Sequence, residues 1–94
     1  MKFAFIIWDN FDFPQDRAAI HSGSAQMVGV SSLEEACIAA RELCDQGVEC
    51  IELCGAFGED GARRIISATH NRIPVGYVTH LPEQDALYTT VFGK

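Results

Sequence analysis

Glu52 is an acidic residue in the middle of an otherwise apolar stretch. It lies within Glu49 to Cys54 (ECIELC), which predicts a covered strand. An unpaired carboxylate in such a strand costs several kcal/mol, or it stays protonated with a raised pKa. Carboxyl groups of that kind serve as general acids and bases, so Glu52 is a candidate for ligand binding or proton transfer. Two structural roles stay open, namely capping the backbone N–H groups of a neighbouring loop and pairing with an arginine.

Cys54 begins a loop with three glycines, among them Gly55 and Gly58, which leads into a predicted helix. Exposed N–H groups at a helix N-terminus favour anions and can lower the pKa of a nearby thiol. The spacing G-x-x-G-x-x-G matches neither the dinucleotide-binding fingerprint nor the Walker loop. Glu59 and Asp60 would also oppose a phosphate, and Asp60 is explained more simply as the N-cap of the helix. The loop is therefore a weak phosphate signal.

His80 follows a predicted strand directly and is the histidine best placed for function. A nucleophilic Cys54 with His80 beside it is one hypothesis, and a structural thiol is the alternative. Cys50 and Cys54 are about 13 Å apart at ~3.3 Å per strand residue. That separation is too long for a disulfide or for two ligands of one metal ion. We therefore expect no metal site, and the sequence leaves any cofactor unknown.

Alternating strands and helices must position these residues. Ser32 and Glu35 form a capping box that starts the clearest helix, and Gly47 favours its end. Cys37 and Cys44 fall on the apolar stripe of this helix and are expected to pack in the core. We expect further helices at residues 15–21 and 61–70, and strands at residues 2–8, 25–30, 48–54, 74–79 and 86–92.

This alternation predicts one α/β domain over residues 1–94 with a small, mostly parallel sheet. A flavodoxin-like order 2-1-3-4 is favoured, with the last strand at an edge and helices on the faces of the sheet. A split βαβ, ferredoxin-like mixed sheet is the alternative. Ligands bind beyond the carboxyl ends of parallel strands, beside the switch point. The candidate ligand-binding residues at these ends are Asp9, Glu52, Cys54, Gly55, Gly58 and His80.

The composition narrows the range of partners. Thirteen acidic and seven basic residues give a net charge of -6, which repels phosphate backbones, so we expect no nucleic-acid partner. No segment approaches the ~20 apolar residues of a membrane helix, and the N-terminus has no signal-peptide pattern, so we expect a cytoplasmic protein away from membranes. Its four cysteines would then be reduced.

Two kinds of function fit these features. The first is a protein or small enzyme that binds a small molecule at the strand ends. The second is a homo-oligomeric structural or interaction module. In that case the predicted C-terminal strand joins protomers, because Leu87, Tyr88, Val91 and Phe92 would make an apolar sheet edge that a monomer normally protects.

The segment from Ile51 to Gly58, with Pro74-Val75-Gly76 downstream, resembles a small bacterial and archaeal family of unknown function. Members have about the same length as this chain, and the most specific part of the likeness is E-L-C-G-x-F-G at Glu52 to Gly58. A second glycine commonly stands in the family where Ala56 stands here. The resemblance implies an α/β fold and brings no catalytic residue with it.

Overall fold

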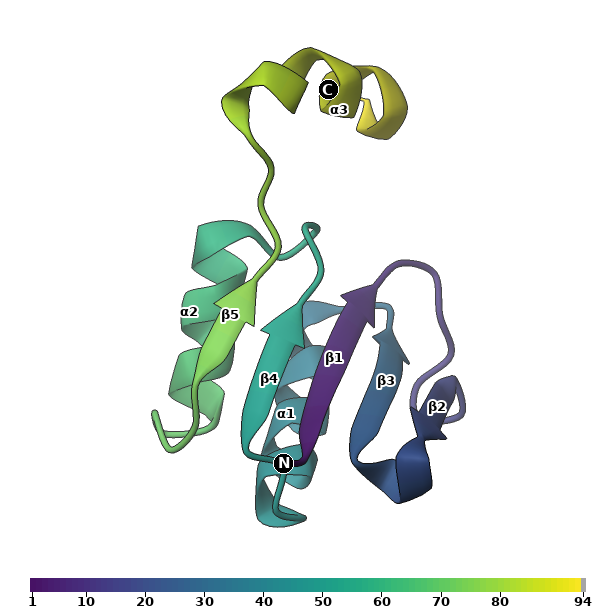
Figure 1. Ribbon diagram of the computed structural model, residues 1–94, viewed down its shortest axis with the longest axis vertical. Helices are drawn as coiled ribbons and strands as arrows, with labels where there is room; N and C mark the ends of the chain where they lie inside the picture. Colours follow the sequence, from purple (N-terminus) through teal and green to yellow (C-terminus); the bar gives the residue numbers. More distant parts are fainter. Residues whose placement is uncertain (94) are drawn as a thin grey trace.

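The computed structural model describes residues 1–93 as a five-stranded sheet with helices (Figure 1). None of the helices in this range is long and apolar enough to cross a membrane. In chain order the elements are β1 (Phe3–Trp8), β2 (Arg17–Ile20), η1 (His21–Gly23), β3 (Ala25–Val30), α1 (Leu33–Asp45), β4 (Cys50–Leu53), α2 (Gly58–Ala68), β5 (Val75–Tyr77), η2 (Pro82–Gln84) and α3 (Asp85–Phe92).

The strand order is β2-β3-β1-β4-β5, which differs from the predicted order. β1 pairs in parallel with β3 and β4, and β4 pairs in parallel with β5, but β2 joins β3 antiparallel. The α/β class is therefore confirmed, with a mixed sheet. The order differs because residues 17–20, expected to be helical, form an edge strand, while residues 86–92 form no strand at all.

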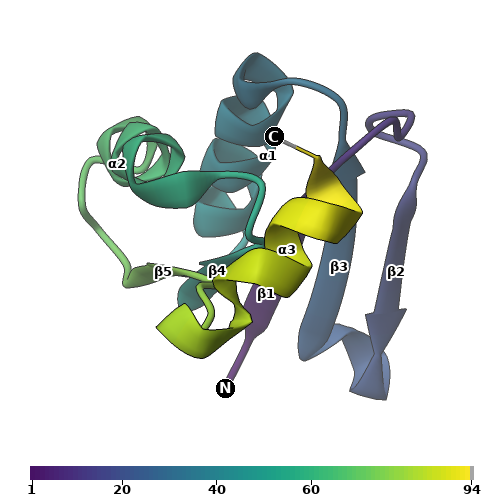
Figure 2. The same ribbon diagram turned by 90° about the horizontal axis from the view of Figure 1, so that it is seen from above.

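Both long helices cover the same face of the sheet (Figure 2), although helices were expected on both faces. The handedness of the connections explains this arrangement. β3 to β4 and β4 to β5 are crossovers that advance in the same direction across the sheet, and right-handed crossovers of that kind put α1 and α2 on one side. The opposite step, from β1 to β3, would cover the other face if it contained a helix. It contains a loop and β2 instead.

The core lies between this sheet face and the two helices. Alternation along the strands turns Ile6 and Ala4 of β1 toward the helices, as well as Ile51 and Leu53 of β4. The buried apolar side chains of the core are Ala4, Ile6, Val28, Val30, Ala36, Cys37, Ala39, Ala40, Leu43, Val48, Ile51, Leu53, Phe57, Ala62 and Ile65. Cys37 packs here as expected, whereas Cys44 is half-buried.

The predicted cap of α1 is confirmed. The Ser32 hydroxyl accepts a hydrogen bond of 3.1 Å from the backbone N–H of Glu35, and the Glu35 carboxylate accepts one of 2.8 Å from the N–H of Ser31. Gly47 follows the helix with φ +95°, the left-handed conformation expected of a C-terminal glycine.

The start predicted for α2 was wrong. The helix begins at Gly58 rather than near Gly61, and Phe57 occupies the N-cap position without a side-chain cap bond. Asp60 therefore lies inside the first turn and caps nothing. Its negative charge still suits the N-terminal end of the helix dipole.

The C-terminal segment was predicted to be a strand and is a helix. Pro82 stands at the start of η2, where its fixed φ suits a helical turn, and Asp85 opens α3 with a favourable acidic charge. Thr89 and Thr90 are β-branched residues typical of strands. Here their hydroxyls donate hydrogen bonds of 3.0 Å to the carbonyls of Asp85 and Ala86, which accommodates both threonines in the helix.

Candidate functional site

The carboxyl ends of the four parallel strands lie at one edge of the sheet, at the top of Figure 1. Asp9 follows β1 at this edge and is exposed. Its backbone N–H donates to the carbonyl of Val30 over 3.1 Å, and its carboxylate accepts a 2.8 Å bond from the N–H of Asn10. The shared edge assumed from the sequence therefore exists, with Asp9 on its rim.

Glu52 points from the middle of β4 onto the sheet face that α1 and α2 leave open. Its neighbour in register on β5 is Gly76, and a Cβ atom at Gly76 would lie 2.6 Å from Glu52 Oε1. The carboxylate thus occupies the space above a residue without a side chain. Neither structural role considered from the sequence is found: within residues 1–93, no arginine and no backbone N–H bonds to this carboxylate. Its partner is the Cys50 thiol, with Sγ 3.6 Å from Oε2.

Cys50 and Glu52 are a coupled pair on this face. Burial raises the pKa of the Cys50 thiol, and the hydrogen bond to Glu52 and the negative charge of Glu52 raise it further. The raised pKa favours the protonated thiol, which donates a weak hydrogen bond to Glu52. No sequence motif singles out Cys50, because its bond to Glu52 depends on the two side chains sharing one face of the sheet.

Cys54 lies at the end of β4, where its backbone N–H donates to the carbonyl of Ile6 over 3.2 Å. Its sulfur accepts a 3.3 Å hydrogen bond from the N–H of Trp8. Its side chain packs against the core. No hydrogen bond joins Cys54 to His80 within residues 1–93, so the arrangement offers the thiol no general base.

His80 lies on the segment between β5 and α3. Its Nε2 atom is 2.7 Å from Oδ1 of Asp85, and its ring stacks on Tyr88 with centroids 3.8 Å apart. Both partners belong to α3. The structure therefore joins His80 to the C-terminal helix rather than to Glu52 or Asp9.

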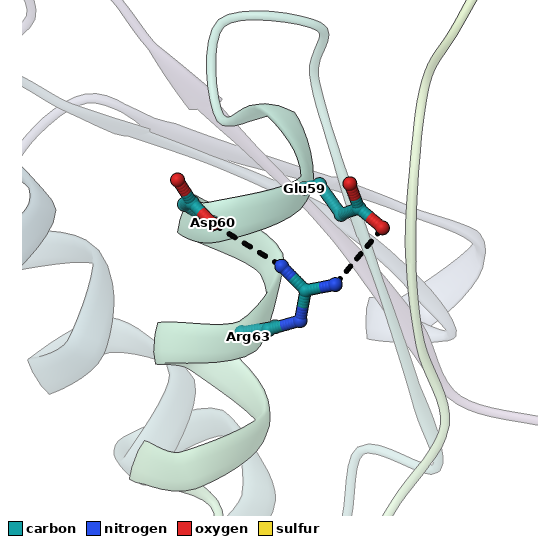
Figure 3. Close-up of polar contacts among 3 residues, drawn as sticks. All are labelled: Glu59, Asp60 and Arg63. Carbon is teal, nitrogen blue, oxygen red and sulfur yellow. Dashed lines mark hydrogen bonds and ion pairs between the residues drawn. The ribbon is translucent and has the colours of Figure 1, made fainter.

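Gly55 and Gly58 shape the loop between β4 and α2. Gly58 has φ +63°, which glycine adopts without strain, and Gly55 lies close to the backbone of Val78. At the start of α2, Arg63 lies between two carboxylates (Figure 3), 2.9 Å from Glu59 and 3.1 Å from Asp60. All three side chains are exposed, so these pairs contribute little to stability. They surround the helix start with negative charge, which disfavours a phosphate there.

The exposed side of the sheet, here called the open face, is the feature that sequence reasoning missed. β1 reads as a strand covered on both sides, but within residues 1–93 only one side carries helices (Figure 2). Phe11 covers the end of β3 at Gly29. On the rest of this side Phe3, Phe5 and Ile7 are half-buried and Met27 is exposed. By strand alternation and register the open face consists of Phe3, Phe5, Ile7, Ala18, Ile20, Ala25, Met27, Cys50 and Glu52.

Comparison with known proteins matches residues 1–93 to a family model described as a family of unknown function, DUF6506. The chain belongs to this family. No curated protein and no solved structure matches it. DUF6506 membership agrees with an uncharacterised protein and assigns it no residue role.

Two hollows on this DUF6506 member lie away from Glu52. The larger, about 450 Å³, is an open groove between α1 and α2, lined in part by Arg41, Arg64 and His70. The smaller, about 350 Å³, lies beside Phe11 and Phe13. None of the six predicted site residues lines either hollow. The predicted residues instead divide between the open face, the rim of strand ends and the segment before α3.

Proposed function

We propose that the open face binds a small molecule that has an apolar body and a cationic or hydrogen-bond-donating group, with Glu52 as its polar anchor. The observation that supports this proposal is a carboxylate among apolar side chains whose partner, among residues 1–93, is one thiol. A carboxylate that accepts so few hydrogen bonds within its own chain is stabilised most by a ligand with a charged hydrogen-bond donor. Small-molecule sites commonly combine an apolar lining with a few polar groups.

Gly76 supports this role for Glu52. Any side chain at residue 76 would collide with the carboxylate, so the glycine permits the position that Glu52 takes against the sheet. Phe5 lies beside Glu52 in the register with β1 and presents an aromatic surface to the same ligand. An aromatic amine would contact Phe5 with its ring and Glu52 with its ammonium group.

Three of the remaining predicted residues belong to this proposal as rim contacts. Asp9, Cys54 and Gly55 lie at the carboxyl edge of the strands, where a ligand longer than one ring would extend from Glu52. Gly58 and His80 are farther along the same loops. The geometry supports binding, and no reaction is proposed.

Titration with phenethylamine, followed by ¹⁵N–¹H correlation spectra, tests the site. We expect saturable shifts of the amide signals of Phe5, Glu52 and Gly76. Glu52→Gln should weaken binding at least tenfold, because it removes the charge that pairs with the ammonium group. Glu42→Gln is the matched control, since Glu42 is an exposed carboxylate on α1, across the sheet from the open face. 2-Phenylethanol has the same ring without the cation and should bind more weakly than the amine.

Equal effects of Glu52→Gln and Glu42→Gln would show that the amine binds through general electrostatic attraction to an acidic protein. Shifts confined to the groove between α1 and α2 would place the binding site there instead. Either result would refute the open face as the site.

A further inference from the structure

The helix α3 projects away from the body of the protein (Figure 1), and none of its residues is buried. Three of its apolar residues have large solvent-exposed fractions, 60% for Leu87, 74% for Val91 and 75% for Phe92. At about 100° per residue these side chains and Tyr88 fall within about 140° of the helix circumference. α3 therefore has a continuous apolar stripe that its own chain leaves in contact with solvent.

The open face is the complementary feature. It is an apolar sheet surface without a helix, and Met27, near its centre on β3, is 45% exposed. Sheets of α/β proteins are normally covered on both faces, because an exposed apolar face of this extent is unfavourable in water. Each chain thus contains one uncovered apolar sheet face and one uncovered apolar helix.

The segment between β5 and α3 leads the helix beyond the end of its own sheet (Figure 1). The N–H of Val78 donates a 2.9 Å bond to the carbonyl of Leu53, which prolongs the direction of β5. His80 is bound to Asp85 and stacked on Tyr88, so it belongs to the α3 unit. Thr79 is the residue left between these two attachments. With both attachments in place α3 stands away from its own sheet, in a position from which it can reach a second molecule.

We propose that two copies of this chain form a symmetric dimer in which each α3 packs its apolar stripe on the open face of the other copy. A short connection that favours exchange of a terminal element is a common route to such dimers. In this two-fold arrangement each copy covers the open face of the other and has its own α3 covered, so no apolar surface of either kind is left for a third molecule.

The exchange would also complete the ligand site. With α3 of the second copy over the sheet, Glu52 would lie in an enclosed space between Phe5 and the aromatic side chains of that helix. Low-dielectric surroundings strengthen its interaction with a cationic group. This consequence rests on the function proposed above, whereas the dimer itself does not.

Sedimentation equilibrium of the full chain over a hundredfold range of concentration tests the dimer. We expect the wild type to be dimeric, and we expect Phe92→Asp on α3 and Met27→Asp on the open face to be monomeric. Both side chains are exposed in the protomer, so circular dichroism should show a folded protein in each case. Ala86→Asp is the matched control, because it introduces the same charge on the opposite side of α3 and should leave the dimer intact.

A wild-type monomer at every concentration would overturn the proposal, in favour of a helix that folds back or binds another protein. A dimer that survives Phe92→Asp would overturn it in favour of pairing through a sheet edge. Dissociation by Ala86→Asp would do the same, since the effect would then be one of charge alone. Phenethylamine titration of the wild type and of Phe92→Asp separates the two proposals: a dimer that binds no amine refutes the ligand site only.

Discussion

At the scale of single residues, Glu52 and Cys50 share the one hydrogen bond identified on the open face, and its chemistry can be tested through the thiol. The raised pKa of Cys50 has burial as its main cause and Glu52 as its second. In Glu52→Gln the negative charge is gone, so the pKa of Cys50 should fall and more thiolate should be present at any pH below it. Iodoacetamide should then alkylate Cys50 faster at pH 8, as measured by peptide mass spectrometry.

Cys37 provides the internal control for this experiment, because it is a buried residue of α1, on the other side of the sheet from Glu52. Its labelling rate should be the same in both proteins. If Cys50 also reacts at an unchanged rate, the thiol and the carboxylate do not interact in solution.

The raised pKa of Cys50 also makes the stability of the fold depend on pH. The folded state holds the thiol proton more tightly than the unfolded state, so this contribution is present below the unfolded pKa and is lost as the pH rises through the folded pKa.

Gly76→Ala displaces Glu52 without removing it. The added Cβ would lie 2.6 Å from the end of a flexible side chain, which can move away at little cost. We therefore expect the free energy of unfolding to change by less than about 1 kcal/mol, a typical limit for glycine-to-alanine substitutions that the backbone tolerates. Phenethylamine binding should nevertheless weaken. Urea denaturation and the amine titration measure the two effects, and a large loss of stability with unchanged binding would contradict this role for Gly76.

At the scale of elements, the local interactions that define α1 can be measured directly. Ser32→Ala removes the hydroxyl that accepts from the N–H of Glu35 and should lower the free energy of unfolding by about 1 kcal/mol. Ser67→Ala, on the exposed side of α2, is the control and should change stability by less than about 0.5 kcal/mol. Equal effects in urea denaturation would show that the Ser32 cap adds nothing to stability.

The sequence predicted correctly those elements that are determined by interactions between neighbouring residues. The cap of α1 and the apolar runs of β1, β3 and β4 depend on neighbouring residues, and these elements are confirmed. The residues of β2 were predicted to be helical, because Pro14 can start a short helix and Gly23 can end one. β2 is a strand because it pairs with β3, which is an interaction between distant segments. α3 was predicted to be a strand from its β-branched residues, but Pro82 and Asp85 favour a helical start.

The candidate site was predicted only in part for a related reason. The sequence left open whether Glu52 pairs with an arginine, and in the structure its partner is the Cys50 thiol. The common edge of the parallel strands, which the sequence did predict, exists. The sequence suggested that β4 was covered on both faces. It does not show that the connection from β1 to β3 lacks a helix on the other side. The open face, and the contact of Glu52 with Gly76, depend on that connection and on the register of β5.

At the scale of the whole molecule, the projecting helix α3 makes the protomer elongated. The radius of gyration is 13.4 Å, and the longest principal extent is 39 Å against 26 and 25 Å for the others. A compact chain of this length has a radius of about 12 Å. The excess agrees with a terminal helix that stands clear of the sheet.

An exchanged dimer predicts that stability depends on protein concentration. Because unfolding then also dissociates two chains, each tenfold rise in concentration should add about 1.4 kcal/mol per dimer to the apparent free energy of unfolding. The thermal midpoint of the wild type should rise accordingly in calorimetric scans. In Phe92→Asp the midpoint should be independent of concentration, and in Ala86→Asp it should follow the wild type. A wild-type midpoint that stays constant over a hundredfold range would mean that the protomer unfolds alone, with α3 and the open face uncovered by a second copy.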